Sequence, residues 1–162
     1  MLCLLPGAEP PVELPVEPLS ILNVNTDAEH AYSDVCILGH FGTLTNTRSL
    51  VHFLKAFQAW RTAHPQAAEH CQIHIYGSQL DAPSRDYVAA QQLERFVKVW
   101  GRLEYSESLG LSGRQQVSIK MRQADGLLLT HGDTAECSEY IPSKFYEYLW
   151  AGRPQIAMVQ MN

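Results

Sequence analysis

Short apolar runs alternate with amphipathic segments from residue 33 to the end of the chain. The apolar runs cover residues 33–42, 71–78, 96–103, 125–132 and 154–159. The segments expected to be helical cover residues 47–65, 84–96, 114–124 and about 142–151. Nearly continuous apolar strands that alternate with helices are typical of a parallel sheet covered on both faces. The pattern therefore predicts an α/β fold, with a doubly wound, Rossmann-like parallel sheet in a single domain.

The segment before this pattern is rich in proline. Five prolines fall between Pro6 and Pro18, and such a run sustains neither a helix nor a central strand. We therefore predict that residues 1–32 are a lead-in or interdomain linker and that residues 33–162 are the folded domain. A chain that starts on such a linker is expected to be a piece of a larger protein.

Charge and composition exclude several classes of function. The formal net charge of −5 and the pI of about 5.7 argue against a nucleic-acid binder, which needs a concentrated basic surface. No stretch reaches the roughly 18 apolar residues of a membrane span. The four cysteines are far apart and form no C-x-x-C pair, so we expect reduced thiols, with Cys36 and Cys71 buried, a cytoplasmic location and no metal site.

The stretch "EYIPSKFYEYLWAGRP" (139–154) predicts a helix with a polar mouth. Proline suits the first turn of a helix, and Gly152 with the following Pro154 suits its end. The unpaired N–H groups around Ser143, Lys144 and Phe145 would be a natural seat for a phosphate. One turn on, Glu147 could accept both hydroxyls of a ribose. The simpler alternative is that Lys144 and Glu147 form an ordinary i, i+3 surface pair.

The first loop, "GHFGTLTNTRSL" (39–50), also suits a ligand that carries phosphate. Gly39 and Gly42 permit close approach of the backbone, Thr43 offers a hydroxyl, and Arg48 carries a fork suited to phosphate at the predicted start of the next helix. The loop matches neither the G-x-G-x-x-G nor the P-loop pattern. A capped helix with a solvated arginine is the alternative interpretation.

A nucleophilic enzyme is less well supported. The chain has no G-x-S-x-G elbow, and no motif places a serine or cysteine near a histidine and an acid. His131 and Asp133 follow an apolar run and could line a pocket. A histidine in such a loop is more often a hydrogen-bonding residue than a base.

Together these segments resemble the C-terminal, nucleotide-sugar-binding domain of B-type glycosyltransferases, which are built from two Rossmann-like domains. The closest resemblance is to the retaining group marked by two glutamates with seven residues between them, here Glu139 and Glu147. The quoted segments that carry the resemblance are "GTLTNTRSL" (42–50), "IHIYG" (73–77), "VKVWGRL" (97–103), "ADGLLLTHG" (124–132) and "EYIPSKFYEYLWAGRPQIA" (139–157).

The resemblance implies roles for individual residues in binding a UDP- or GDP-linked sugar, with no further cofactor. Glu147 would hold the ribose. Arg102 and Leu103 would frame the base through their backbone. Glu139 would face the donor sugar or the reacting centre. The diphosphate would be received by the remaining site residues, which are Gly42, Thr43, Arg48, Ser143, Lys144 and Phe145.

In chemical terms, the resemblance assigns catalysis to Glu139, Arg48 and Lys144. The diphosphate gains negative charge as it leaves, and the two cations with the helix dipole would stabilise that charge without a metal. The sugar would pass through an oxocarbenium-like state, as in glycoside chemistry.

The sequence departs from the family pattern in three places. Thr43 follows Gly42 where the family usually has an arginine, which leaves Arg48 as the only cation of that loop. The segment "PSK" replaces a glycine-and-apolar segment between the two glutamates, so Glu136 competes with Glu139 for the first position. The chain also ends at Asn162, before the family's last helices, so we expect the domain to be incomplete at its C-terminus.

The family's acceptor domain is missing from this chain. The catalytic cleft of the family lies between two domains, so we expect the isolated chain to bind a donor but not to transfer sugar. An acceptor glycan or lipid would bind the missing N-terminal domain, and a parent protein with a lipid acceptor would associate peripherally with a membrane. Two alternatives stay open: a nucleotide-sugar epimerase of the same architecture and a non-catalytic α/β interaction module.

Overall fold

The computed structural model describes residues 35–132, 134, 137 and 141–159 of the 162-residue chain. The predicted linker, residues 1–32, lies outside this range. Five strands and five helices are described, namely β1 (Cys36–Phe41), α1 (Val51–Ala63), α2 (Pro65–Ala68), β2 (Cys71–Tyr76), α3 (Ala82–Ala90), β3 (Val97–Gly101), α4 (Gly113–Gln123), β4 (Gly126–Thr130), α5 (Ser143–Ala151) and β5 (Gln155–Met158).

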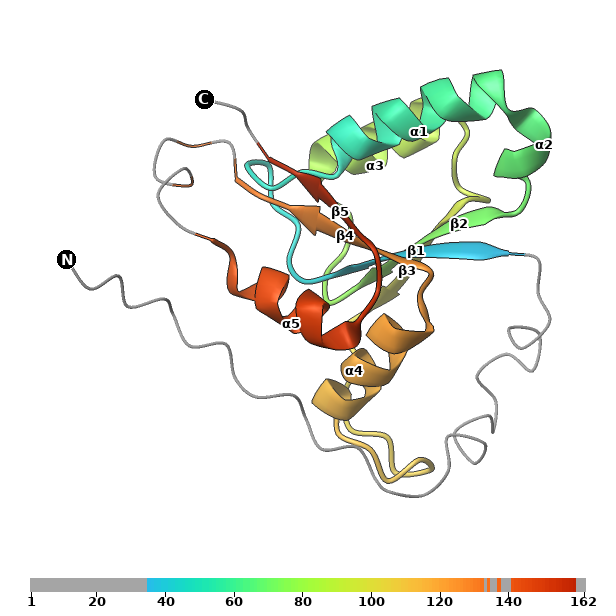
Figure 1. Cartoon of the computed structure of the whole chain (residues 1–162). Coiled ribbons are helices and arrows are strands. Elements are labelled where there is room, and N and C mark those ends of the chain that lie inside the picture. Colours follow the sequence, from blue (N-terminus) through green and yellow to red (C-terminus); the bar gives the residue numbers. More distant parts are fainter. Residues whose placement is uncertain (1–34, 133, 135–136, 138–140, 160–162) are drawn as a thin grey trace.

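The strands form one parallel sheet in the order β3-β2-β1-β4-β5. Helices α1, α2 and α3 lie on one side of the sheet, and α4 and α5 lie on the other (Figure 1). The chain winds outward from β1 to β3, then crosses back to β4 beside β1. This arrangement confirms the predicted doubly wound, Rossmann-like α/β fold.

The face under α1 and α3 carries the larger apolar core. Leu54 and Phe57 of α1 pack with Ile73 and Ile75 of β2 and with Val88 of α3, and all are buried. The spacing of the α1 side chains matches the helical period, so one stripe of the helix meets the sheet. The helical period of Leu50, Leu54 and Phe57 agrees with this face, but Trp60, which continues the same period, is exposed.

The face under α4 and α5 is smaller and more aromatic. Phe41, Tyr76 and Tyr148 are buried there with Met121 of α4 and Leu129 of β4. The ring of Phe41 stacks on Tyr76 with centroids 4.8 Å apart and meets Tyr148 edge-on at 6.3 Å. Tyr148 is the fully buried side chain of α5 at the centre of the sheet, and Phe145 packs against the same cluster.

Several local predictions were wrong. Helix α1 begins at Val51 rather than near residue 47, so Arg48 lies in the loop before it, and Pro65 starts a separate short helix. A helix packed on the sheet through all its aromatic residues would also bury Trp150, but that side chain is exposed. Cys36 is exposed although Cys71 is buried; Cys36 is the first residue of β1, where the strand has only just entered the sheet. The two edge strands, β3 and β5, are also more exposed than a sheet covered on both faces implies.

No helix among the described residues is both long and apolar enough to cross a lipid bilayer.

Candidate functional site

The carboxyl ends of β1 and β4 diverge at the centre of the sheet. Strand β1 pairs with β2 along its whole length, up to Phe41 opposite Tyr76. Its pairing with β4 stops at Gly39 opposite Leu127. This is the point where strand order reverses, and ligands of doubly wound folds bind outside such a divergence.

The hydroxyl of Tyr148 links the two diverging strands. The backbone N–H of Phe41 donates to the Tyr148 hydroxyl oxygen at 3.0 Å, and that hydroxyl donates to the Leu128 carbonyl at 3.2 Å. Burial raises the pKa of Tyr148 far above its usual value, so the group stays a neutral donor. The Tyr148 hydroxyl thus connects β1 and β4 beyond the point where their backbone hydrogen bonds stop. It also fixes α5 relative to both strands.

His40 completes this polar cluster on the other face of β1. Its Nδ1 lies 3.0 Å from the Leu128 carbonyl oxygen, and because a carbonyl only accepts, Nδ1 carries the hydrogen. Its Nε2 is buried without a hydrogen-bond partner in the described part of the chain. Burial, followed by the charge of Lys144, lowers the pKa of His40 despite the opposing Leu128 bond and Asp81 charge. The ring is therefore held neutral.

A glycine turn follows β1 directly. The N–H of Gly42 donates to the Tyr76 carbonyl at 2.9 Å, and Gly42 has a φ of +152°. A Cβ on the neighbouring Gly77 would lie 2.9 Å from the Gly42 carbonyl oxygen. At this point the backbones of the loops after β1 and β2 are in direct contact, which leaves no room for a side chain at position 77 and requires glycine there.

The rest of the first loop forms a small turn that presents Thr43 and Arg48 to solvent. Thr43 is exposed, whereas Leu44 is buried and donates its N–H to Ser78 Oγ at 3.0 Å. Thr45 and Arg48 pair across the turn, with the Arg48 N–H 3.0 Å from the Thr45 carbonyl oxygen. Arg48 is exposed three residues before α1. The loop, rather than a helix N-terminus, positions this cation.

An acidic residue missed by the sequence interpretation holds this loop in place. Asp81, the N-cap of α3, is buried and accepts hydrogen bonds from Ser49 Oγ at 2.5 Å and from Ser84 Oγ at 2.7 Å. Burial alone would raise the pKa of Asp81, but these bonds and those from the Ser84 and Leu50 N–H groups lower it overall. The motif D-x-P before a helix is the signal that could have revealed this cap.

Helix α5 begins at Ser143, as predicted. Pro142 occupies the N-cap position and contributes no side-chain hydrogen bond to the first turn. Ser143 is exposed, and Phe145 is half-buried against the aromatic core. Because the bond from Tyr148 fixes α5 beside the end of β1, the N-terminus of α5 lies at the carboxyl edge of the sheet.

Lys144 of this first turn contacts Glu147 at the start of the second turn. The Lys144 Nζ lies 2.6 Å from Glu147 Oε2, and the side chains are 28% and 38% exposed. This is the i, i+3 pair that the simpler interpretation predicts. Both groups nevertheless lie half-buried at the mouth of the helix, and the contact uses only one of the two carboxylate oxygens.

The remaining predicted site residues follow β3. Gly101 has a φ of +71°, which turns the chain sharply after the strand. Arg102 is exposed, and Leu103 is half-buried against the core beneath α5. A Cβ on Gly113 would lie 2.0 Å from the Leu103 carbonyl oxygen, so α4 starts in close contact with this loop. β3 stands two strands from β1, which corresponds to about 10 Å.

A cavity of about 640 Å³ opens on the α1 side of the same edge. His131 and Gly132, which follow β4, form part of its wall, as predicted for His131. Gly132 donates its N–H to His131 Nδ1 at 2.8 Å, and a Cβ on it would lie 2.4 Å from Cys137 Sγ. The other lining residues come from the first loop, α1, α3 and the end of β5, namely Asn46, Thr47, Ser49, Val51, His52, Pro83, Ala157, Met158 and Val159.

The predicted first glutamate is not placed by the structure. Glu139, its competitor Glu136 and the pocket candidate Asp133 all lie outside the described residues. The structure brings Lys144 and Glu147 into contact and sets Gly42 beside α5. It leaves Arg102 at the far side of the sheet edge.

Comparisons with known proteins agree with the architecture. No protein-family model and no curated protein matches the chain. Among solved structures, the chain is similar to "OtsA apo structure", with a TM-score of 0.50 and 12% sequence identity over 93% of this chain and 32% of that one. The chain thus spans about a third of the length of OtsA. At this identity the likeness concerns the fold alone, and it agrees with the doubly wound, Rossmann-like α/β fold of the chain.

Proposed function

We propose that the carboxyl edge of the sheet binds the nucleoside diphosphate part of a nucleotide sugar, and that the chain is the donor-binding part of a glycosyltransferase. The observation that carries the proposal is the position of α5. Its N-terminus, with Lys144 in the first turn and Glu147 at the start of the second, is fixed beside the glycine turn of β1 where the strands diverge. The Rossmann-like fold, which the domains of B-type glycosyltransferases share, is consistent with this assignment.

The spacing of the site residues suits a nucleoside diphosphate. The loop after β3, with Arg102 and Leu103, lies about 10 Å from the end of β1, a span that base, ribose and diphosphate can cover together. The base would lie at that loop and the ribose at Glu147. The diphosphate would accept hydrogen bonds from the Ser143 and Lys144 N–H groups, and it would form a charge-assisted hydrogen bond with the Arg48 guanidinium.

Binding on these lines requires Lys144 to release Glu147. The Lys144 ammonium group would turn to the diphosphate. The freed Glu147 carboxylate would then accept hydrogen bonds from the two ribose hydroxyls. An exposed i, i+3 pair is worth about 0.2–0.5 kcal/mol, which is small beside the charge-assisted hydrogen bonds gained. Charge that develops on the leaving diphosphate would then be stabilised by Arg48, Lys144 and the helix dipole. Glu139 stays a proposed contact of the donor sugar.

Isothermal titration calorimetry of the chain with UDP and GDP tests the proposal. We expect one of the two to bind, and Glu147→Gln to weaken binding about tenfold or more because a charged hydrogen-bond acceptor is lost. Glu107→Gln removes the same charge from an exposed loop and should leave affinity unchanged. No binding by the folded chain, or equal binding by both variants, would contradict the proposal.

A non-catalytic interaction module is the second candidate function. The edge strand β3 exposes the apolar side chains of Val99 and Trp100. Contact with a protein partner would bury this apolar surface. A folded chain that binds neither nucleotide would favour this role. An epimerase of the same architecture would use the same donor site, and product analysis with the parent protein and a panel of nucleotide sugars separates it from a transferase.

A further inference from the structure

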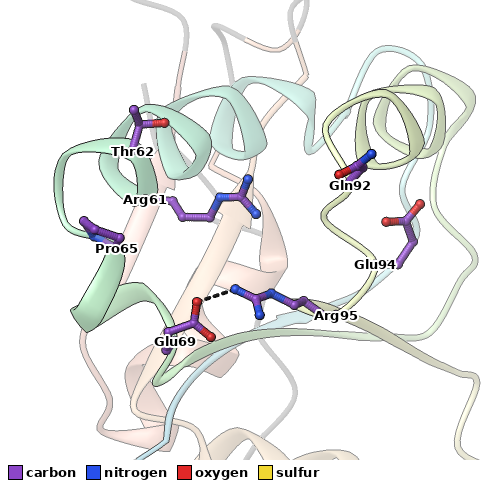
Figure 2. Close-up of a pocket in the computed structure, with 7 residues that line it drawn as sticks. All are labelled: Arg61, Thr62, Pro65, Glu69, Gln92, Glu94 and Arg95. Atoms are coloured by element: carbon purple, nitrogen blue, oxygen red, sulfur yellow. Dashed lines mark hydrogen bonds and ion pairs between the residues drawn. The ribbon is translucent and has the colours of Figure 1, made fainter.

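A second cavity, of about 710 Å³, lies at the opposite end of the molecule from the α5 mouth. It is an open pocket lined by the last turn of α1, by α2 and by the segment between α3 and β3, near the points where β2 and β3 begin (Figure 2). Its lining is dominated by polar and charged groups, namely Arg61, Thr62, Pro65, Glu69, Gln92, Glu94 and Arg95.

Two arginines share one aromatic ring beneath this cavity. The guanidinium carbons of Arg61 and Arg95 lie 5.2 and 4.4 Å from the centroid of the buried Phe96 ring. Two like charges held by one ring repel each other unless a negative group lies between them. The arrangement therefore favours an anion in the cavity.

The nearby carboxylates of Glu69 and Glu94 neutralise the two arginines only in part. Glu69 accepts a hydrogen bond from one terminal nitrogen of Arg95. Arg61 forms no ion pair with any residue in the described part of the chain, although it is half-buried. Figure 2 shows its guanidinium directed into the cavity and the carboxylate of Glu94 directed away from Arg95. Because each guanidinium offers five N–H donors, most of the donors here lack a charged acceptor.

The helix dipole explains only part of this arrangement. An arginine in the last turn of α1 offsets the partial negative charge at that helix end. That accounts for a cation at position 61 but not for its direction into the cavity beside a second cation. The Thr62 hydroxyl bonds to the Gln58 carbonyl at 3.0 Å, so it belongs to the helix rather than to a ligand.

We propose that this cavity binds a phosphate group, either inorganic phosphate or the monoester of a small molecule, between Arg61 and Arg95. Phosphate presents several acceptor oxygens in the geometry that a guanidinium fork matches. The anion would bridge the two guanidiniums above Phe96 and would share Arg95 with Glu69. For a monoester, the Gln92 amide at the rim lies where it could meet the organic part.

Calorimetric titration of the full chain with inorganic phosphate and with glycerol 3-phosphate, at constant ionic strength, tests this site. We expect at least one of them to bind, and Arg61→Met to weaken that binding about tenfold while keeping the apolar stem over Phe96. Arg95→Met should weaken it comparably. Tighter binding of the ester would identify a monoester as the preferred source of the phosphate group, and tighter binding of phosphate would identify the free ion.

Matched controls separate this site from general charge and from the donor site. Arg85→Met removes an exposed arginine whose partner is its neighbour Asp86, and it should leave phosphate affinity unchanged. Glu147→Gln should also leave it unchanged, so the outcome here is independent of nucleotide binding. Binding of neither probe by the folded chain, or binding that survives both Arg61→Met and Arg95→Met, would overturn the proposal.

Discussion

Charged side chains are paired to different extents at the two ends of the sheet. At the carboxyl end, Lys144 is paired with Glu147, and the buried Asp81 accepts hydrogen bonds from several donors. At the amino end, Arg61 points into a cavity without an ion pair among the described residues. The carboxyl end is thus a preformed and internally bonded scaffold, whereas the amino end keeps donors in excess. Substitutions of the buried groups at the first end, such as Tyr148 and Asp81, should cost folding stability, whereas substitution of Arg61 or Arg95 at the second end should cost mainly anion binding.

Tyr148→Ala is expected to have the largest effect of any substitution at the carboxyl end. It removes a fully buried ring and both hydrogen bonds that link β1 to β4, which should lower the free energy of unfolding by about 3–5 kcal/mol. Urea denaturation measures this loss. Tyr148→Phe keeps the ring and should cost about 1–3 kcal/mol through the unpaired Phe41 N–H.

Arg61→Met, at the amino end of the sheet, is the variant to compare with the two Tyr148 substitutions. It should cost less than about 1 kcal/mol of unfolding free energy, because the stem keeps its packing and no ion pair is lost. If it destabilised the chain as much as Tyr148→Ala does, the proposed contrast between the two ends would fail.

Asp81→Ala should cost about 2 kcal/mol of unfolding free energy. The substitution removes the α3 N-cap and leaves the Ser49 and Ser84 hydroxyls without their acceptor. Because the pKa of Asp81 is lowered in the folded state, its contribution is present at neutral pH and is lost as pH falls below the usual aspartate value. Denaturation of wild type and Asp81→Asn between pH 6 and pH 3 measures this, and parallel pH profiles would contradict it.

His40 should make stability depend on pH in a higher range. The pKa of His40 is lowered from 6.5 in the folded protein, so the unfolded chain binds more protons as pH falls through about 6.5. Stability should be unaffected above that value and should decline below it. His40→Asn can keep the bond to the Leu128 carbonyl through its amide nitrogen, and its stability should decline less between pH 7 and pH 5. An equal decline in both proteins would assign the effect to other groups.

Separating Lys144 from Glu147 should have the smallest effect on stability. Lys144→Gln is expected to change the free energy of unfolding by no more than about 0.5 kcal/mol, since the pair is partly exposed and lies on one helix. The same variant should nonetheless weaken nucleotide binding, because the ammonium would contact the diphosphate. A loss of stability well above this size would mean that the pair is structural rather than available to a ligand.

The architecture was readable from the sequence because each element follows a simple period. Apolar runs such as 71–78 and 125–132 located β2 and β4, and Gly152 marked the end of α5. The start of α1 was misplaced because the Thr45–Arg48 turn contains residues that also suit a first helical turn. Periodicity reports which residues are buried, but it does not distinguish a turn from a helix over a few polar residues.

The candidate site was predictable only where one segment carries it. Ser143, Lys144 and Glu147 belong to a single helix, so their grouping follows from the helical repeat. The bridge by Tyr148 and the bonds from Ser49 and Leu50 to Asp81 depend on contacts between residues far apart in sequence, which no local pattern encodes. The same is true of Arg61 and Arg95, which meet only because α1 and the α3–β3 segment pack around Phe96.

The most direct test of the donor site is a map of backbone amide chemical shifts of the chain during titration with UDP and GDP. The proposal predicts that the largest changes fall at Gly42, Thr43, Ser143 and Lys144, with further changes at Leu103, and that Glu147→Gln shifts the titration midpoint to about tenfold higher nucleotide concentration. Changes confined to the amino end around Arg61, or no changes in the folded chain, would contradict nucleotide binding at the carboxyl edge of the sheet.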